Sequence, residues 1–403
     1  MSATATFSNT EHSYGGVTKA FHWLTALLIL TAFPIGLIAN DYPYDTSAQL
    51  AVKATLFSVH KTLGVTVVFV AVARILWALS QPKPGLLHPD RRLESFAAEF
   101  VHWMLYVSLI FVPLSGWIDH ASTTGFAPIW WPFGQDLPFV PKSLLVSNIF
   151  GTLHDVFTKI LLAALVLHIL GAVKHAIIDR DATLRRMLPG AAAVTVPAQR
   201  HSVAPKVAAF GLWALVVAGG VSLAMLETDQ TRPETVALEA APSEWAVQSG
   251  TLGISVRQFG SNVTGSFANW TTAISFDPEA AGGTLGNVKV DIDMGSLTLG
   301  TVTSQALGNG FLDSADHPTA TFAGDIQRDG DGYVVNGTLD LVGQSAPVTL
   351  PFTLVLDGDT AHATGETVID RRTFGVGMAS HGDESALGFP VTISIDLTAT
   401  RGE

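Results

Sequence analysis

Two histidines on one apolar stretch have the types and spacing to do chemistry. His154 and His168 lie in LHDVFTKILLAALVLH, fourteen residues apart. On an α-helix that spacing is about 21 Å along the axis and within roughly 40° of the same face. Ionisable side chains inside a membrane span are costly and are functional by default. A helix that turns one imidazole to the same side near each membrane surface has the geometry that two stacked haems require.

His22 and His60 supply partners at matching depths. His22 lies in KAFHWLTALLIL, one turn into the first apolar stretch, and His60 lies in FSVHKTLGVTVV near the start of the second. Bis-histidine ligation of haem iron needs two neutral imidazoles on opposite faces of the porphyrin. A lone histidine in an apolar span is more often a packing residue, but four matched in depth are hard to explain that way. We expect His22 to pair with His168 and His60 with His154, and His102 to be structural or to contact a haem propionate.

Composition excludes several other kinds of site. The chain has no cysteine, which excludes disulfides, iron–sulfur clusters, thiolate catalysis and thiolate zinc sites. Its net charge is −12, so no nucleic-acid partner is expected. The charge is unevenly spread: 15 Lys and Arg stand against 13 Asp and Glu up to residue 230, and 7 against 21 thereafter. This distribution predicts a membrane part joined to an acidic soluble part.

Five apolar stretches are long enough to span a bilayer. They cover roughly residues 18–39, 57–80, 98–119, 150–178 and 206–226. Lys and Arg gather in the segments 81–97 and 179–205, whereas 40–56 and 120–149 hold one lysine each. By the positive-inside rule the N-terminus is cytoplasmic. The fifth span then carries the rest of the chain outside, which predicts a multi-pass protein of the bacterial inner membrane with a periplasmic C-terminal part.

From about residue 245 the apolar period changes to two. Runs such as VKVDIDMGSLTL and APVTLPFTLVLDG alternate, with Gly, Asp and Asn between them. Short alternating strands separated by turn residues predict an all-β sandwich or barrel. The segment 231–244 has the composition of a polar, proline-containing linker. A short helix is expected only near 301–308.

The front of the chain resembles the bacterial cytochrome b561 family of four-helix, di-haem membrane proteins. The resemblance covers roughly residues 13–190 and rests on YGGVTKAFHWL, VHKTLGV, LHDVFTK, LHILGAVKH and DATLRRMLPG. It implies two haem b groups on four histidines, which carry over to His22, His60, His154 and His168. It also implies a ubiquinone site, for which His175 is either a proton-accepting contact or an interfacial histidine. Superoxide oxidation coupled to ubiquinone reduction is one candidate reaction.

The acidic tail resembles the YceI family, lipocalin-like barrels that enclose a polyisoprenoid chain. The resemblance covers about residues 245–401 and rests on VTGSFANWTTAISFDPE, FLDSADHPTATFAG, GTLDLVGQSAPVTLPF and ETVIDRRTFGVGM. An eight-stranded barrel can hold one apolar ligand inside. We expect Phe267, Trp270 and Phe322 to touch such a ligand. Arg371 and Arg372 are expected at the surface rather than at the polar head of the ligand.

The predicted architecture is multidomain. An all-α transmembrane four-helix haem bundle (1–190) is followed by a cytoplasmic loop and a fifth transmembrane helix (191–230), a linker (231–244) and an all-β lipocalin-like antiparallel barrel (245–403).

Two functions fit this architecture. One is a haem-dependent oxidoreductase or electron-transfer protein that moves electrons between a membrane quinone pool and a periplasmic-side donor or acceptor. In it haem iron carries the electrons, and no residue acts as a catalytic nucleophile or general base. The other is a membrane-anchored carrier of an isoprenoid lipid, in which the haem domain has a secondary redox or anchoring role.

Overall fold

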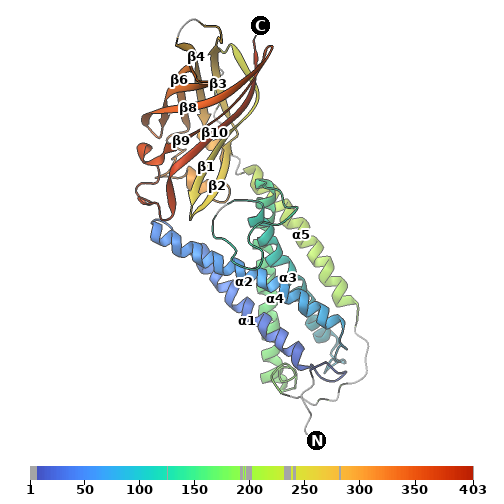
Figure 1. The fold of residues 1–403 in the computed structure, drawn as a ribbon. Helices are drawn as coiled ribbons and strands as arrows, with labels where there is room; N and C mark the ends of the chain where they lie inside the picture. The colour runs from blue at the N-terminus through green and yellow to red at the C-terminus, as the bar shows by residue number, and fades with distance from the viewer. Residues whose placement is uncertain are drawn as a thin grey trace. The chain divides into compact units, whose positions relative to one another are not determined.

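The chain consists of apolar helices followed by one antiparallel sheet (Figure 1). The computed structural model describes residues 7–124, 126–190, 202–230, 242–280 and 283–402, together with 194, 196, 237 and 238. The predicted fold class, all-α followed by all-β, is confirmed. The expected linker 231–244 lies largely outside the described residues. Helical and sheet parts fall into two compact units, and each is described by itself.

Five long helices, apart from residues 47–54 at the start of α2, make up the first unit in the described part of the chain. They are α1 Gly16–Asp41, α2 Ser47–Leu79, α3 Arg92–Ala121, α4 Leu144–Lys174, which one π turn His175–Asp179 continues, and α5 Ala204–Gln230. Each contains an 18-residue window of mean hydropathy between 1.6 and 2.3, enough to cross a bilayer. Large apolar side chains on them, such as Leu76 and Leu215, are exposed, as lipid-facing residues are. The chain is therefore a membrane protein.

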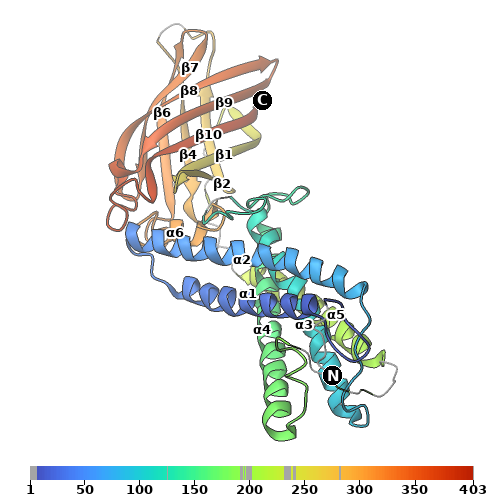
Figure 2. The ribbon, with the colours of Figure 1, turned by 60° about the horizontal axis from the view of Figure 1, so that its bottom comes forward.

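The helices α3, α4 and α5 pack closely against one another. Met104 and Val107 of α3 and Leu161 of α4 belong to their shared buried core. Trp213 of α5 is 2% exposed. The helices α1 and α2 approach these three less closely along their length, and Figure 2 shows them side by side across the α3–α4 pair.

The second unit contains a curled antiparallel sheet with the strand order β3-β4-β6-β7-β8-β9-β10-β1-β2-β5. Its strands are β1 Trp245–Gln258, β2 Ser261–Phe267, β3 Trp270–Phe276, β4 Thr284–Asp293, β5 Leu297–Thr298, β6 Thr319–Asp329, β7 Gly332–Leu341, β8 Gln344–Asp357, β9 Thr360–Asp370 and β10 Leu387–Arg401. Edge strand β3 also lies against β1, so the sheet curls around its own interior.

The described part of the sheet has ten strands. After β1, Phe259 and Gly260 both have positive φ (47° and 80°) and reverse the chain into β2. Such left-handed pairs favour two-residue hairpins. The two-residue strand β5 pairs only with β2. The short helix expected near 301–308 is present as α6 Thr303–Leu307.

Candidate functional site

One pair of histidines joins α2 to α4. The ring centres of His60 and His154 are 6.2 Å apart, with their planes at 83°. His60 Nδ1 donates to the carbonyl oxygen of Ala32 and His154 Nδ1 to that of Val112, each at 2.8 Å. A carbonyl can only accept, so Nδ1 carries the hydrogen in both rings. The bond fixes each ring and leaves Nε2 available to a metal.

The helices beside these rings make room for them with glycine. A Cβ at Gly36 of α1 would lie 2.6 Å from the ring of His60, and a Cβ at Gly116 of α3 would lie 2.9 Å from that of His154. Real Cβ atoms do not approach a ring so closely. Both glycines follow a proline within the same helix, Pro34 and Pro113. Proline removes a helical hydrogen bond and bends a helix, so Pro-x-Gly and Pro-x-x-Gly are the sequence signal for these two contacts.

A second pair joins α1 to α4. His22 and His168 have ring centres 6.1 Å apart, with planes at 57°. The four histidines therefore lie in the two pairs that were predicted from the sequence. His102 of α3 lies beside this pair, with its ring centre 5.0 Å from that of His168 at 86°. Its Nδ1 donates to the carbonyl oxygen of Ala98 at 2.6 Å.

Polar residues that were not predicted from the sequence surround the His60–His154 pair. Lys61 is buried, directly after His60, and interacts electrostatically with Asp119. Asp119 accepts a 2.5 Å hydrogen bond from Ser147 Oγ. The buried Nδ1 of His120 has no hydrogen-bond partner in the part of the chain that the structure describes. The signal for this group was the charged Asp-His dipeptide at the end of an apolar stretch.

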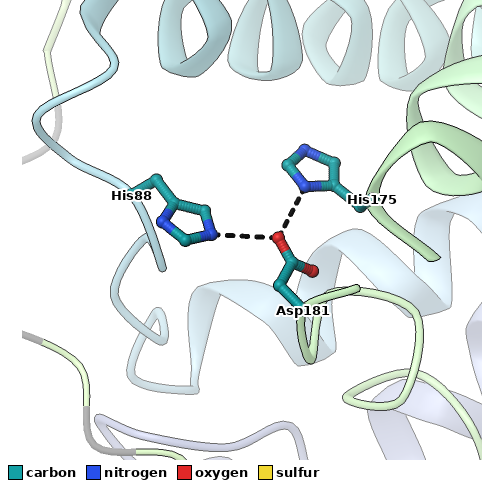
Figure 3. A group of neighbouring side chains, drawn as sticks. All are labelled: His88, His175 and Asp181. Atoms are coloured by element: carbon teal, nitrogen blue, oxygen red, sulfur yellow. Dashed lines mark hydrogen bonds and ion pairs between the residues drawn. The ribbon is translucent and has the colours of Figure 1, made fainter. Parts of the chain in front are cut away.

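His175 lies in a second cluster, with His88 and Asp181 (Figure 3). Asp181 Oδ2 accepts from His175 Nδ1 at 2.7 Å and from His88 Nε2 at 3.0 Å. The two imidazoles are parallel within 1°, with centres 6.3 Å apart. Of these three residues, only His175 was predicted from the sequence. Asp181 is the first residue of the DATLRRMLPG motif, which was the available signal.

The backbone after α4 brings Asp181 back to His175. His175 opens the π turn, and Arg180 at its end takes a left-handed conformation with φ 52°. The Asp181 N–H then bonds the His175 carbonyl at 3.1 Å. π turns inside α-helices frequently mark functional sites. The wide turn followed by a left-handed residue therefore positions this cluster.

The charge of Asp181 is fixed by its hydrogen bonds. Burial by itself raises the pKa of this carboxyl, but hydrogen bonds from Thr183, His175 and His88 outweigh it and hold the pKa well below its usual value. The Thr183 N–H bonds Asp181 Oδ1 at 2.8 Å, which leaves Oδ2 for the two imidazoles.

Basic residues neutralise the other carboxylates nearby. Lys174 bonds Glu94, and reaches Asp179 at 2.9 Å. Arg91 lies 3.2 Å from each of the same two carboxylates. Lys174, at the C-terminal end of α4, is thus part of an ionic network.

The sheet encloses an apolar cavity of about 290 Å³. Phe267, Trp270 and Phe322 line it, as predicted for residues that touch a ligand. The cavity wall also includes Arg371 and His381, which are polar. A mostly apolar cavity with few polar groups is typical of a small-molecule site.

The expected surface position of Arg371 is wrong. Arg371 is 3% exposed, and its guanidinium donates to the carbonyl oxygens of Gly388, Val376, His381 and Leu387 at 2.6–3.0 Å. The segment after β9 folds these carbonyls around the five guanidinium donors, which the sequence does not reveal. Arg372 is exposed, as expected, and pairs with Asp370.

Two parts of the chain match known families. Residues 13–190 match the family described as prokaryotic cytochrome b561, and residues 242–399 match the YceI-like domain. The chain is 33% identical over 186 residues to cytochrome b561 homolog 2 of Escherichia coli (strain K12), a match that covers 45% of this chain and 94% of that protein. The chain belongs to the prokaryotic cytochrome b561 family. It carries a YceI-like domain in addition.

Further relatives of this b561 chain were found among curated proteins and solved structures. It is 23% identical over 177 residues to the probable superoxide oxidase CybB of Yersinia pestis, covering 44% of this chain and 96% of that protein. The crystal structure of Burkholderia cenocepacia BcnA is 30% identical, with a TM-score of 0.36, and covers 38% of this chain and 96% of that one. A Campylobacter jejuni YCEI protein is 21% identical, with a TM-score of 0.32, covering 36% and 87%.

The b-type haem that b561 membership implies fits both histidine pairs. Two metal–imidazole bonds of about 2 Å each and two ring radii of about 1 Å span roughly 6 Å between ring centres. The separations of 6.2 Å for His60–His154 and 6.1 Å for His22–His168 match this span. The 5.0 Å contact of His102 with His168 is too short for it. Nδ1 of His60 and of His154 each donates a hydrogen bond to a backbone carbonyl oxygen. Histidines that bind metals commonly make such a bond with their other ring nitrogen.

Proposed function

We propose that the chain is a b-type cytochrome of the bacterial inner membrane that moves electrons between a quinone and a donor or acceptor on the opposite face. His22 with His168, and His60 with His154, would each hold one haem b. The observation that carries this proposal is the pair of matched ring separations, 6.1 Å and 6.2 Å. Haem, when bound, supplies the one-electron chemistry.

In this proposal the protein handles protons at His175. The Asp181 carboxylate accepts the Nδ1–H of His175, which fixes the ring and leaves Nε2 to exchange a proton with a quinone. Quinone reduction takes two electrons and two protons, so a group that exchanges protons beside the quinone is required. His88 also bonds the Asp181 carboxylate. The hydrogen-bonded chain therefore continues from His175 through Asp181 to the segment before α3. By the positive-inside rule this end of the bundle is cytoplasmic.

Superoxide is the donor that we favour at the His60–His154 end. Two superoxide ions give up one electron each, and one quinone takes both electrons with two protons, which leaves two O₂ and one quinol. The relative named as a probable superoxide oxidase supports this choice. So does buried Lys61 beside His60, because a cation attracts a small anion.

The YceI-like domain would hold an isoprenoid-type ligand on the periplasmic side. Its apolar cavity of about 290 Å³ supports this assignment. The ligand of the barrel and the quinone of the membrane part would then be chemically related. The same cavity also favours a second candidate function, in which the chain is an anchored lipid carrier and the haems serve a secondary role.

Full-length protein purified in detergent tests the proposal. We expect a b-type reduced-minus-oxidised spectrum, haem reduction by a short-chain ubiquinol, and loss of one haem per chain in His60→Ala. The matched control is His362→Ala, which removes an exposed histidine of β9. Absence of a b-type spectrum, or an unchanged haem content in His60→Ala, contradicts the haem assignment. Haems that ubiquinol does not reduce, in protein that co-purifies with an isoprenoid, favour the carrier.

A further inference from the structure

Three ligand atoms of the kinds that bind zinc converge at the end of α4. His88 Nε2, His175 Nδ1 and a carboxylate oxygen of Asp181 all lie within 4.8 Å of one another. Figure 3 shows that the two rings reach the carboxylate from different segments, one before α3 and the other at the π turn. Imidazole nitrogen and carboxylate oxygen are ligands that Zn²⁺ takes in proteins, at 2.0–2.2 Å.

The spacing of these atoms is close to that of a tetrahedral site. Ligand atoms about 2 Å from a tetrahedral zinc ion are roughly 3.3 Å from one another. Asp181 Oδ2 lies 2.7 Å from His175 Nδ1 and 3.0 Å from His88 Nε2. A cation between the three would open these distances by a few tenths of an ångström, within the reach of side-chain rotation.

The surroundings support a cation at this position. The Thr183 N–H holds Asp181 Oδ1, as outer hydrogen bonds hold the carboxylates that bind metals. Asp179 Oδ2 lies 3.2 Å from His175 Nδ1, but Lys174 and Arg91 neutralise its charge. Arg91 and Lys174 pair with Glu94 and Asp179, whereas the ion-pair partners of Asp181 among the described residues are the two imidazoles.

The cluster is partly exposed to solvent, so an ion can reach it. The side chains of His88, His175 and Asp181 are 34%, 20% and 12% exposed. Three protein ligands with partial exposure leave a fourth coordination position for water, as in zinc sites that are not fully closed by protein.

We propose that His88, His175 and Asp181 form a binding site for Zn²⁺. An ion bound at His175 Nδ1 leaves the ring hydrogen on Nε2, so that Nε2 can no longer accept a proton, and proton exchange with the quinone slows. The binding site stands on its own geometry. Its inhibitory effect rests on the proposed function, because it requires that His175 serve a quinone.

Zinc binding is measured first, on full-length protein in detergent without a polyhistidine tag. After chelator treatment and equilibration with ZnCl₂ in the low micromolar range, we expect one bound zinc per chain by elemental analysis and titration calorimetry. His88→Ala and Asp181→Asn should each weaken binding at least tenfold. His88→Cys should retain it, because a thiolate replaces the lost ligand.

His12→Ala is the matched control, since His12 is an exposed histidine near the loop that carries His88. Its zinc content should equal that of the unsubstituted protein. An unchanged haem spectrum in every variant verifies folding. Absence of stoichiometric zinc, or binding that survives both His88→Ala and Asp181→Asn, overturns the proposed site and leaves the cluster as a hydrogen-bonded relay.

The inhibitory effect is measured separately. Zinc should slow ubiquinol reduction of the haems in the unsubstituted protein and in His12→Ala, and the slowing should be lost in His88→Ala. If zinc binds at one per chain but leaves the rate unchanged, the inhibitory part is wrong. If the zinc-free protein is not reduced by ubiquinol at all, the proposed function fails while the binding result stands.

Discussion

The imidazole of His154 lies directly against Gly116, so that a Cβ at that glycine would be 2.9 Å from the ring. The adjoining turn of α3 supplies the Val112 carbonyl that receives the Nδ1 hydrogen of His154. One helix turn therefore both makes room for the ring and holds it. The arrangement of His60 with Gly36 and Ala32 of α1 repeats this relationship.

Gly116→Ala should therefore act on the haem next to His154 without touching a ligand. The added methyl group displaces the ring and breaks its alignment, so we expect the haem content per chain to fall toward that of His154→Ala. Gly171→Ala is the control, because a Cβ at this glycine of α4 meets nothing within 4 Å. Absorbance of the reduced protein and pyridine haemochrome analysis measure both. Equal haem contents in the two variants would contradict the contact.

His102→Ala should keep both haems, whereas His22→Ala should lose one. The reason is the ring separation: 6.1 Å for His22–His168 leaves space for an iron, and 5.0 Å for His102–His168 does not. The haem stoichiometry of the purified variants decides whether His22 or His102 pairs with His168. Loss of a haem in His102→Ala with retention in His22→Ala would reverse the assignment.

Two adjacent arginines should differ sharply in their contribution to stability. Arg371→Met leaves several buried carbonyl groups without donors, and we expect it to lower the free energy of unfolding of the sheet by about 3 kcal/mol or more. Arg372→Met removes an exposed ion pair with Asp370, which should cost less than about 1 kcal/mol. Hydrogen exchange of β9 and β10 peptides in full-length protein measures both. Similar losses would show that burial of Arg371 does not matter.

The stability of the segment between β9 and β10 should depend on pH through His381. Burial, then the positive charge of Arg371, lowers the pKa of His381, and Asp383 opposes this shift. The unfolded chain therefore binds a proton at His381 more readily than the folded one. Stability is at its full value above the unfolded pKa of about 6.5 and falls as the pH drops through it, until the folded state is protonated too.

We accordingly expect amides near His381 to open more readily at about pH 5.5 than at about pH 7.5, after correction for intrinsic exchange rates. His381→Gln should flatten this dependence, and His362→Gln, at an exposed histidine of β9, should leave it intact. A dependence that persists in His381→Gln would assign it to another group.

The sequence predicts those features that depend on a local period. Because the α-helix repeats regularly, the spacing of His154 and His168 alone predicted that both face one side, and apolar length alone predicted the membrane helices. Alternation predicted the sheet, and Phe267, Trp270 and Phe322 lie in its interior as expected.

Other features depend on how irregular segments return to the fold. His88 lies in the segment between α2 and α3, and Asp181 follows a π turn; no period relates them, so their approach to His175 could not be predicted. The surface position expected for Arg371 was wrong for the same kind of reason, since two of the four carbonyls around it come from the irregular segment between β9 and β10 and the other two from the start of β10. Gly36 and Gly116 were predictable in principle from the prolines that precede them, once the partner helix was known.

Trp213 shows that the helical core extends beyond the part of the chain that matches the cytochrome b561 family. The similarity to cytochromes b561 ends at residue 190, but the Trp213 ring of α5 lies edge-on against Phe111 and Phe157, with centres 5.3 Å and 5.1 Å away. In a chain shortened at residue 190, the rings of Phe111 and Phe157 would lose this contact with Trp213. The fifth helix is thus a structural part of the cytochrome as well as the segment that leads to the YceI-like domain. The family match ends at residue 190, but the packed core of the helices includes α5.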